Sequence, residues 1–426
     1  MIRRALLLFE DSEAGRRLVG RRVAGLSLLE RQVRTLERAG IRRLRVLLPV
    51  GARPTLSSHA QRLNIQVEFA TWETVGAAPD EDFLLLLAPF VHHHSSLSAL
   101  TAEGLAGDRL VAHSGPPAED KPGSSGVFVC AAGLLPEKEL HLAPDLWPLL
   151  HHAAGEEAVR LHRQDPALWQ PVFDRRGARA AKAMLFGQVT KTTSGPISRH
   201  INARLSIPTS KFLVETGMSP HLVTVSLVLT TGLASAYLVA HADDYALLAL
   251  SGLGWQMAAV LDRCDGEIAR VKLCESKFGA WFDTVTDNIA YLFMYAGIVI
   301  GMHRLYPDTA LFMYLGVSAV IALLLTLGIM YSYAFKTGSG SLQHYLYAMR
   351  NDIPAADKGW VVRVIDRYGF VTKRDSFSFF YFLFAVAGLL ELAYAVVVIM
   401  LHCIAIGVVY TNSKMLRAHR AGGHDR

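Results

Sequence analysis

Four aspartates of this chain stand between two apolar segments, where a carboxylate is costly to bury. They lie in residues 261–288 and are Asp262, Asp265, Asp283 and Asp287. The first two are three residues apart and the last two are four apart, so on two helices each pair shares one face. Converging carboxylates repel one another unless cations are present, and Mg²⁺ or Mn²⁺ prefers such oxygen ligands. The spacing therefore predicts a divalent-metal site.

Small and basic residues accompany these aspartates. Gly266, Ala269 and Gly279 remove side-chain bulk beside the carboxylates, and Arg270 can neutralise phosphate oxygens. From the first aspartate to the last, the stretch reads D-x2-D-G-x2-A-R-x8-G-x3-D-x3-D. This pattern indicates a site for a large flat or phosphorylated ligand.

The elements that must position this stretch are apolar and long. The chain has 426 residues, of which 51% are hydrophobic, a high share for a soluble protein. From about residue 221 onward, apolar stretches approach the length of a bilayer-spanning helix. We predict six spans, with Glu391 as the break between the last two: 221–241, 244–263, 279–302, 307–334, 376–391 and 392–412.

Basic residues predict the orientation of these spans. Lysines and arginines gather before the first span, between the second and third, between the fourth and fifth, and after the sixth. The other connections hold one arginine between them. The positive-inside rule then puts both termini and the aspartates on the cytoplasmic side of the cell (inner) membrane. We expect no nucleic-acid partner. Residues 196–217 have an apolar helical face and predict an amphipathic helix in the headgroup plane, bent at Pro208.

The aspartate stretch resembles the signature of the CDP-alcohol phosphotransferase family, with every position matched. "SPHLVTVSLVL" at 219–229 resembles the start of that family's first span, and "KRDSFSFFYF" at 373–382 the start of its fifth. The resemblance implies a six-helix, all-α transmembrane domain that is usually homodimeric and needs Mg²⁺ or Mn²⁺. It also implies transfer of a phospho-alcohol group from a CDP-alcohol to an acceptor hydroxyl, with release of CMP.

The same resemblance implies roles for the individual residues. All four aspartates would bind the metal, with Asp262, Asp265 and Asp283 as the main ligands. Asp283 and Asp287 would also be catalytic, with Asp287 as the general base. The residues implied to line the cytidine diphosphate pocket are Asp265, Gly266, Ala269, Arg270 and Gly279.

Residues 1–190 predict an α/β domain. An apolar strand at "ALLLFE", an amphipathic helix followed by a strand within 21–51, and the apolar runs at 82–90 and 125–135 follow the order of an α/β sheet. This part resembles the Rossmann-like sugar-nucleotidyltransferases, which in some relatives are fused at this position. The layout is similar to that of fused inositol-phosphate cytidylyltransferase and di-myo-inositol-phosphate phosphate synthases.

The amino-terminal part departs from that pattern where chemistry would occur. "EDSEAGRRLVGRRV" replaces a glycine-rich phosphate loop, and "LLAPFVHHH" replaces a strand that ends in a metal-binding aspartate. We therefore expect a degenerate domain that serves scaffolding, dimerisation or regulation and does not turn over CTP. We further expect His92–His94 to form a solvated turn rather than a metal site.

The predicted organisation is a nucleotidyltransferase-like domain at 1–190, a linker with the interfacial helix at 191–220, the transmembrane domain at 221–415 and a basic tail at 416–426. CDP-diacylglycerol, a donor used in phospholipid biosynthesis, is the first expectation, with a polar acceptor and membrane lipids around the protein. CDP-inositol with inositol phosphate as acceptor is the alternative. Arg199, Lys277 and Arg374 are candidates to bind an acceptor phosphate. The alternative functional classes are a cation-coupled transporter and a catalytically silent membrane scaffold.

Overall fold

The structure is a computed structural model of the chain, and it describes residues 1–74, 79–115, 124–134, 146–190, 195–337 and 374–422. Contacts divide the chain into two compact units. The first unit consists of Met1–Val189 with the short segments Val214–Thr216 and Arg270–Cys274. The second consists of Thr190–Leu213, Gly217–Ala269 and Glu275–Arg426. Contacts define compact units but not their functions, so the domain boundaries given by the sequence stay a prediction.

A seven-stranded mixed sheet forms the centre of the first unit, in the order β10-β8-β9-β6-β1-β4-β5. The central strand β1 is parallel to β4 and β6, while β9 is antiparallel to β6 and β8. The strands are β1 Arg4–Leu8, β4 Arg43–Leu48, β5 Gln66–Thr71, β6 Phe83–Leu87, β8 Leu110–Ser114, β9 Val127–Cys130 and β10 Val159–Arg163. Two small sheets pair β7 Phe90–His92 with β11 Trp169–Pro171, and β2 Arg22–Val23 with β3 Leu26–Ser27.

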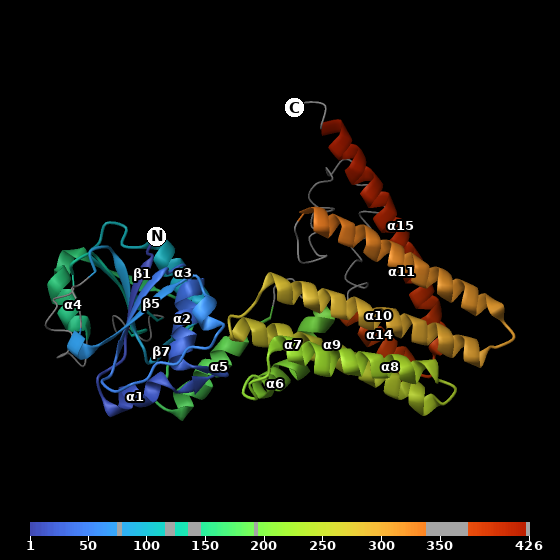
Figure 1. The fold of residues 1–426 in the computed structure, drawn as a ribbon, viewed down its shortest axis with the longest axis horizontal. Coiled ribbons are helices and arrows are strands. Elements are labelled where there is room, and N and C mark those ends of the chain that lie inside the picture. Colours follow the sequence, from blue (N-terminus) through green and yellow to red (C-terminus); the bar gives the residue numbers. More distant parts are fainter. Residues whose placement is uncertain (75–78, 116–123, 135–145, 191–194, 338–373, 423–426) are drawn as a thin grey trace. The chain divides into compact units, whose positions relative to one another are not determined.

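Helices cover both faces of this sheet. Helix α4 lies on one face and α2 and α3 lie on the other (Figure 1). The α4 side packs Leu146 and Leu150 against the apolar strand residues Leu6, Phe83 and Leu110. The helices are α1 Glu13–Val19, α2 Leu28–Arg38, α3 His94–Glu103, α4 Leu146–Ala154 and α5 Arg175–Gly187, with short 3₁₀ turns η1 Ala60–Arg62, η2 Trp72–Thr74 and η4 Glu156–Ala158. The α/β class predicted for residues 1–190 is confirmed.

The histidine prediction in this unit is wrong. His92 ends β7 and is 1% exposed, and its Nε2 lies 3.0 Å from the carbonyl oxygen of Ser125. His93 caps the amino terminus of α3, where its Nδ1 accepts from the backbone N–H of Ser95. The apolar run before His92 continues into a strand that pairs with β11, so the polar triplet begins inside the core rather than in a solvated turn.

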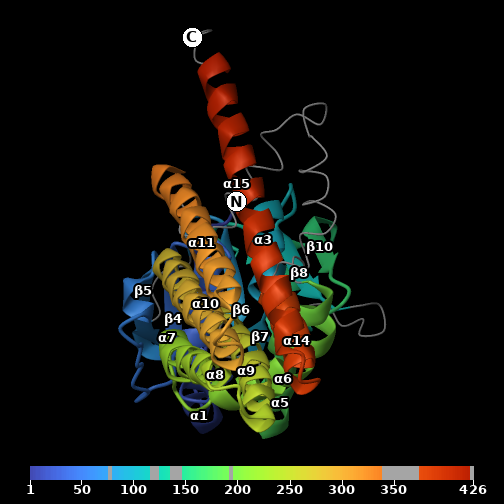
Figure 2. The same cartoon turned by 90° about the vertical axis from the view of Figure 1, so that its right-hand side faces the viewer.

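All secondary-structure elements in the described part of the second unit are helices. Its elements are η5 Ser198–Asn202, α6 Ala203–Leu213, α7 Pro220–Val223, η6 Thr224–Leu229, α8 Thr230–Ala240, α9 Tyr245–Val271, α10 Lys277–Leu305, α11 Ala310–Thr337, α14 Arg374–Val386 and α15 Leu390–Gly422. Helix α11 contacts both α10 and α15; α15 crosses α11 in Figure 1, and α10 and α11 lie side by side in Figure 2. Much of α11 is exposed and apolar, including Tyr314, Ile321 and Phe335, as expected for a surface in lipid.

Four described helices are long and apolar enough to cross a membrane, against the six spans predicted. They are Pro220–Ala240, Lys277–Leu305, Ala310–Phe335 and Leu390–Ser413. Helix α9 has 27 residues but its polar residues keep it outside this set, and α14 has only 13. The chain breaks at Gly388, whose φ is +73°, and not at the predicted Glu391, which lies in the first turn of α15.

Small residues let the helices of the second unit approach one another closely. A Cβ at Gly297 of α10 would lie 2.4 Å from the carbonyl oxygen of Ala236 on α8, and one at Gly301 would lie 2.3 Å from that of Val239. A Cβ at Gly252 of α9 would lie 2.6 Å from Ala385 of α14. Glycines at such contacts are typical of packed membrane helices. They hold the helices that carry the aspartates in fixed register with their neighbours.

Candidate active site

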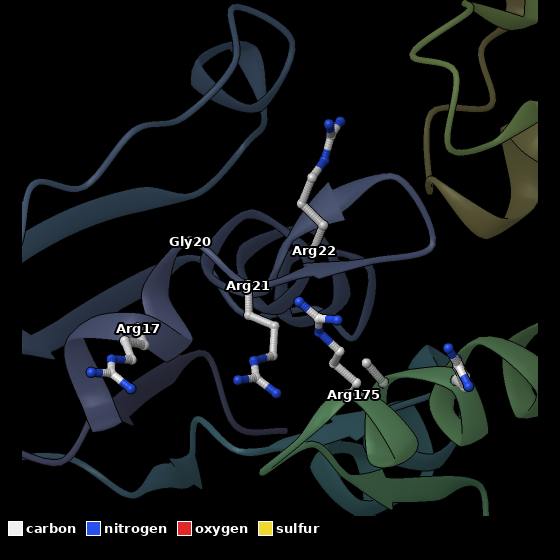
Figure 3. A pocket seen from close by; sticks show the side chains of 7 residues that line it. Arg17, Gly20, Arg21, Arg22 and Arg175 are labelled. Atoms are coloured by element: carbon white, nitrogen blue, oxygen red, sulfur yellow. The ribbon is translucent and has the colours of Figure 1, made fainter. Parts of the chain in front are cut away.

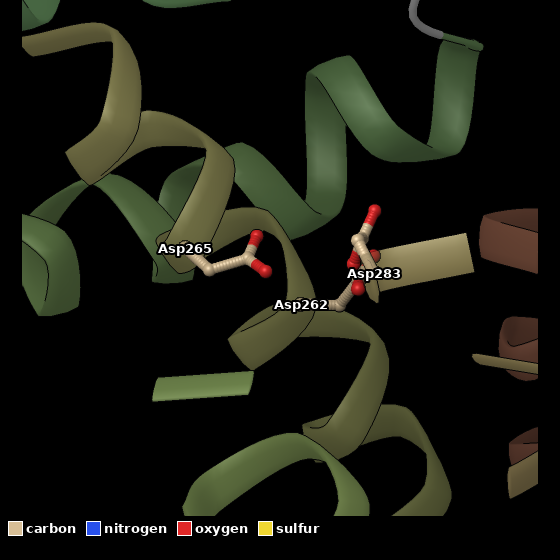
Figure 4. A group of neighbouring side chains, drawn as sticks. All are labelled: Asp262, Asp265 and Asp283. Atoms are coloured by element: carbon tan, nitrogen blue, oxygen red, sulfur yellow. The ribbon is translucent and has the colours of Figure 1, made fainter. Parts of the chain in front are cut away.

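Three of the four predicted aspartates converge in the second unit. Asp262 and Asp265 from α9 and Asp283 from α10 point toward one another (Figure 4). One carboxylate oxygen from each lies within 4.8 Å of the others. The three-residue spacing places the first two on one face of α9. The sequence prediction that two successive helices bring carboxylates together is therefore confirmed for these three.

Asp287 lies one turn after Asp283 on the same helix and outside this group of three. It is half-buried, and its charge is one of the causes that raise the pKa of Asp265. Asp287 is therefore near the group without converging on the same point. This position agrees with the role implied by the resemblance, which put Asp287 beside the metal as a base, and that role stays a prediction.

Asp265 is the most enclosed of the three converging carboxylates, at 8% exposed. Its Oδ2 accepts a 2.5 Å hydrogen bond from Thr224 Oγ1, and its Oδ1 accepts from the backbone N–H of Gly266. Asp265 follows the predicted span 244–263, and burial raises its pKa to about 7, with a further contribution from the charge of Asp262. The two hydrogen bonds act in the opposite direction but do not cancel these effects.

The chemistry of this donor set fits a hard divalent cation. Each converging side chain offers a carboxylate oxygen, the ligand that Mg²⁺ and Mn²⁺ prefer. A cation would also offset the repulsion that raises the pKa of Asp265. These three aspartates can therefore hold a divalent ion together, and the number and identity of ions remain proposals.

Local sequence explains how the second pair of aspartates is placed. Ser276 caps the amino terminus of α10, where its Oγ accepts a 2.9 Å hydrogen bond from the N–H of Gly279. A Cβ at Gly279 would lie 3.2 Å from Cε1 of His221 and 3.1 Å from Ser276 Oγ. Gly279 thus keeps the first turn of α10 open one turn before Asp283.

A buried polar network beside the aspartates was not predicted. Glu267 is fully buried and accepts hydrogen bonds from Ser206 Oγ at 2.8 Å and Ser210 Oγ at 2.7 Å. Arg263 donates to the same carboxylate at 3.1 Å and also to Ser198. Burying an ion pair requires such complete hydrogen bonding. Arg263 ends the second predicted span and contributes to the basic connection that follows it, but this ion pair neutralises its charge inside the unit.

The helix over 198–213 buries polar side chains and exposes apolar ones, the reverse of a helix on the surface of a soluble protein. Its inward residues Asn202, Ser206 and Ser210 are polar and buried. Its outward residues include Leu205, 51% exposed, and Phe212, 71% exposed. An apolar outer face suits a headgroup layer, so these exposures agree with the predicted interfacial helix. Pro208 lies inside α6, and placement in a bilayer stays a prediction.

The remaining predicted residues are placed as follows. Gly266 and Ala269 lie on α9 after Asp265, and Arg270 lies in the last turn of that helix and belongs to the first unit. The acceptor candidates Arg199 and Lys277 are exposed, on η5 and at the start of α10. Arg374 opens α14, and its side chain lies outside the described residues. Elements η5 and α14 are joined by a 3.0 Å hydrogen bond from Asn202 to Asp375. Binding of an acceptor phosphate by Arg199, Lys277 and Arg374 stays a prediction.

The signal for some missed residues was present in the sequence. Thr224 is a polar residue within the first predicted span, and Glu267 is a charged residue at a variable position of the aspartate pattern. A buried polar side chain in such a place needs a partner. That rule indicates that each side chain has a hydrogen-bond partner, but it does not identify the partner.

Similarity to known proteins is found in the sequence of the chain and in part of its fold. No family model matches the chain. The chain is similar to proteins named "Bifunctional IPC transferase and DIPP synthase". The protein from Rubrobacter xylanophilus is 28% identical over 331 residues, which cover 68% of this chain and 74% of that protein. The protein from Thermococcus kodakarensis is 35% identical over 121 residues, which cover 28% of this chain and 26% of that protein.

Solved structures are similar to part of the chain. The inositol-1-phosphate CTP transferase from T. maritima has 15% identity and a TM-score of 0.35, over 43% of this chain and 95% of that chain. The UTP-bound UGPase from Acinetobacter baumannii has 13% identity and a TM-score of 0.35, over 45% of this chain and 95% of that chain.

Proposed function

We propose that the chain is a membrane-bound, divalent-metal-dependent CDP-alcohol phosphotransferase. It transfers a phospho-alcohol group from a CDP-alcohol to an acceptor hydroxyl and releases CMP. The observation that supports this most strongly is the convergence of Asp262, Asp265 and Asp283 from two successive helices. These residues lie in a pattern that matches every position of the family's signature.

The reaction is a displacement at phosphorus. The acceptor oxygen forms a bond to the phosphorus that carries the donor's alcohol, and the bond between this phosphorus and the bridging oxygen of the diphosphate breaks. CMP leaves with that oxygen. The proton of the acceptor hydroxyl passes to the Asp287 carboxylate, which acts as general base. Asp287 lies one turn beyond Asp283 on the same helix, so it would be close enough to the metal-binding aspartates to take this proton.

Asp262, Asp265 and Asp283 would hold the divalent ion, Mg²⁺ or Mn²⁺. When bound, the ion neutralises the diphosphate and stabilises CMP as the leaving group. Thr224 fixes the orientation of the Asp265 carboxylate. Gly266, Ala269 and Gly279 leave room for the cytidine diphosphate, and Arg270 neutralises its phosphate oxygens.

Two donor classes remain in this proposal. CDP-diacylglycerol with a polar acceptor, as in phospholipid biosynthesis, suits the four apolar helices and the exposed apolar face of α6. The names of the similar proteins, which pair a transferase with a synthase, favour a second candidate. In that candidate the donor is CDP-inositol, the acceptor is an inositol phosphate, and the product is a phosphodiester of the di-myo-inositol phosphate type.

The proposal also includes the membrane placement and the oligomeric state of the enzyme. It spans the cell membrane several times, contacts membrane lipids and works as a homodimer with its active site and both termini in the cytoplasm. The basic connections support this orientation through the positive-inside rule.

The amino-terminal domain has a scaffolding, dimerisation or regulatory role and does not turn over CTP. After β1 the chain forms the capped helix α1 in place of a glycine-rich loop, and β6 is followed by Ala88 and Pro89 in place of an aspartate. The purified chain with CTP and inositol 1-phosphate should release no pyrophosphate, and release above a no-enzyme control would refute this role.

The reaction class is tested by incubating the purified chain with CDP-diacylglycerol or CDP-inositol, candidate acceptors and Mg²⁺ or Mn²⁺. Metal-dependent formation of CMP and a phosphodiester is expected. Cation flux across proteoliposomes without CMP formation would instead identify a transporter. Failure to bind any CDP compound would identify a silent scaffold.

A further inference from the structure

A pocket of about 410 Å³ in the first unit is lined almost entirely by arginines. They are Arg17, Arg21, Arg22, Arg175 and Arg179, and a glycine and an alanine complete the lining. Figure 3 shows Arg17 and Arg21 on one side and Arg175 reaching from α5 toward the strand that Arg22 begins. All of these residues belong to the first unit, and none of them is one of the converging aspartates.

Two regions that are far apart in sequence build this pocket. Arg17 comes from α1, Arg21 lies between α1 and β2, Arg22 begins β2, and the other two arginines come from the first turns of α5. Asp174 caps α5 with a 2.7 Å hydrogen bond from the N–H of Gly177. A Cβ at Gly177 would lie 2.3 Å from the carbonyl oxygen of Pro171, so the glycine lets α5 start close against β11. The arginines of α5 are therefore held by fixed backbone.

The positive charge of the pocket is mostly uncompensated within the described residues. Arg17 pairs with Glu13, and Arg22 donates to the carbonyl oxygen of Gly25 at 3.1 Å. Nη1 of Arg21 is buried and has no hydrogen-bond partner in the described part of the chain. A buried donor without a partner is costly, and guanidinium groups around one cavity repel one another. Both costs fall when an anion occupies the pocket.

We propose that this pocket binds a ligand that carries two or more phosphoryl groups. One phosphoryl group has about −1.5 to −2 charges at neutral pH, less than the four guanidinium charges left after the Arg17–Glu13 pair. Two such groups match that charge. Guanidinium groups bind phosphate oxygens through paired hydrogen bonds. Arginines that only make a surface basic and are solvated by water would not need to line a common pocket. The ligand is either a soluble phosphorylated molecule or the headgroup of a phosphorylated lipid.

Calorimetric titration of the full chain with inorganic pyrophosphate tests this site. The protein is held in phosphatidylcholine nanodiscs with EDTA, so that the aspartates hold no metal. Arg175→Ala and Arg21→Ala should each weaken pyrophosphate binding about tenfold or more. Arg176→Ala is the matched control, since Arg176 is an exposed arginine of the same helix outside the pocket lining. Arg176→Ala and Asp283→Asn should bind like the unmodified chain.

The source of the ligand is distinguished by adding phosphatidylinositol bisphosphate, a lipid whose headgroup carries two phosphoryl groups, to the nanodiscs, with phosphatidylserine at the same total charge as the control. Weaker pyrophosphate binding with the bisphosphorylated lipid but not with phosphatidylserine assigns the site to a lipid headgroup, and unchanged binding with both lipids assigns it to a soluble ligand. Equal loss of binding in Arg175→Ala and Arg176→Ala would overturn the proposal, because that result describes general surface charge. No binding of pyrophosphate by the unmodified chain would overturn it as well.

Discussion

Thr224 donates a 2.5 Å hydrogen bond from its Oγ1 to Oδ2 of Asp265. The two residues lie 41 positions apart, on the helical segment η6 and on α9, and both are buried. This bond fixes one oxygen of the carboxylate, and the N–H of Gly266 binds the other oxygen. The threonine therefore orients the most buried of the three converging aspartates.

Thr224→Val should weaken Mn²⁺ binding by about tenfold or more, because a partner that orients a metal ligand typically changes affinity by 10- to 100-fold. Valine keeps the shape of threonine and removes the hydroxyl. Manganese binding by electron paramagnetic resonance measures the change. Thr224→Ser keeps the hydroxyl and should restore affinity. Equal affinity in the valine variant and the unmodified chain would show that Asp265 needs no such partner.

Metal binding should strengthen as pH rises through the pKa of Asp265, which is about 7 without metal. Below that value a proton occupies the carboxylate and competes with the ion, so apparent affinity should change by about tenfold per pH unit in the region below about pH 7. Burial is the main cause of the raised pKa, followed by the charge of Asp262. Titration with Mn²⁺ between about pH 6 and 8 measures the slope. A flat profile would contradict this ligand assignment.

The first unit should lose stability in mild acid. Burial lowers the pKa of His92 to about 3 and of His113 to about 4, against about 6.5 in an unfolded chain. The unfolded chain then binds more protons between about pH 6.5 and 4, so each histidine removes up to about 1.4 kcal/mol of stability per pH unit on acidification. Hydrogen exchange of β7 and β8 in the full chain, corrected for intrinsic rates, measures this loss. His92→Gln should reduce the pH slope, and an unchanged slope would exclude His92 as its cause.

If the acceptor carries a phosphate, Lys277→Ala and Arg374→Ala should each raise its KM about tenfold or more, with donor KM little changed. Cations near the aspartates offset the repulsion between the acceptor phosphate and the acidic site. Arg204→Ala is the control, since Arg204 is exposed and basic but is not an acceptor candidate. Equal effects on donor and acceptor would place these residues at the nucleotide, and no effect would leave them with a role in topology.

The spacing of the aspartates predicted their meeting because helical periodicity alone puts residues three and four apart on one face. The alternation and apolar runs of residues 1–190 likewise predicted an α/β sheet. Both signals are local. The position of Asp287, one turn outside the converging group, depends on how α9 and α10 meet and was not visible in the pattern.

Tertiary partners account for the predictions that differ from the structure. Glu391 was a chemically reasonable break between spans, yet the turn is at Gly388, where a positive φ is needed, and Glu391 accepts a hydrogen bond from Tyr306. Arg263 resembled a surface charge but is bonded to buried Glu267. His92 resembled a solvated residue but extends a strand paired with β11. None of these outcomes follows from the local hydrophobic pattern alone.

The central claim is tested most directly by CMP release from the CDP-alcohol donor that the chain accepts, measured with purified protein in nanodiscs. Asp283→Asn is compared with Asp308→Asn, because Asp308 is an exposed aspartate in the turn after α10 and outside the aspartate group. The account predicts that the unmodified chain and Asp308→Asn release CMP only with Mg²⁺ or Mn²⁺, and that Asp283→Asn loses about 10³-fold or more in rate. Turnover that survives Asp283→Asn, or that continues after metal is removed by chelation, would contradict it.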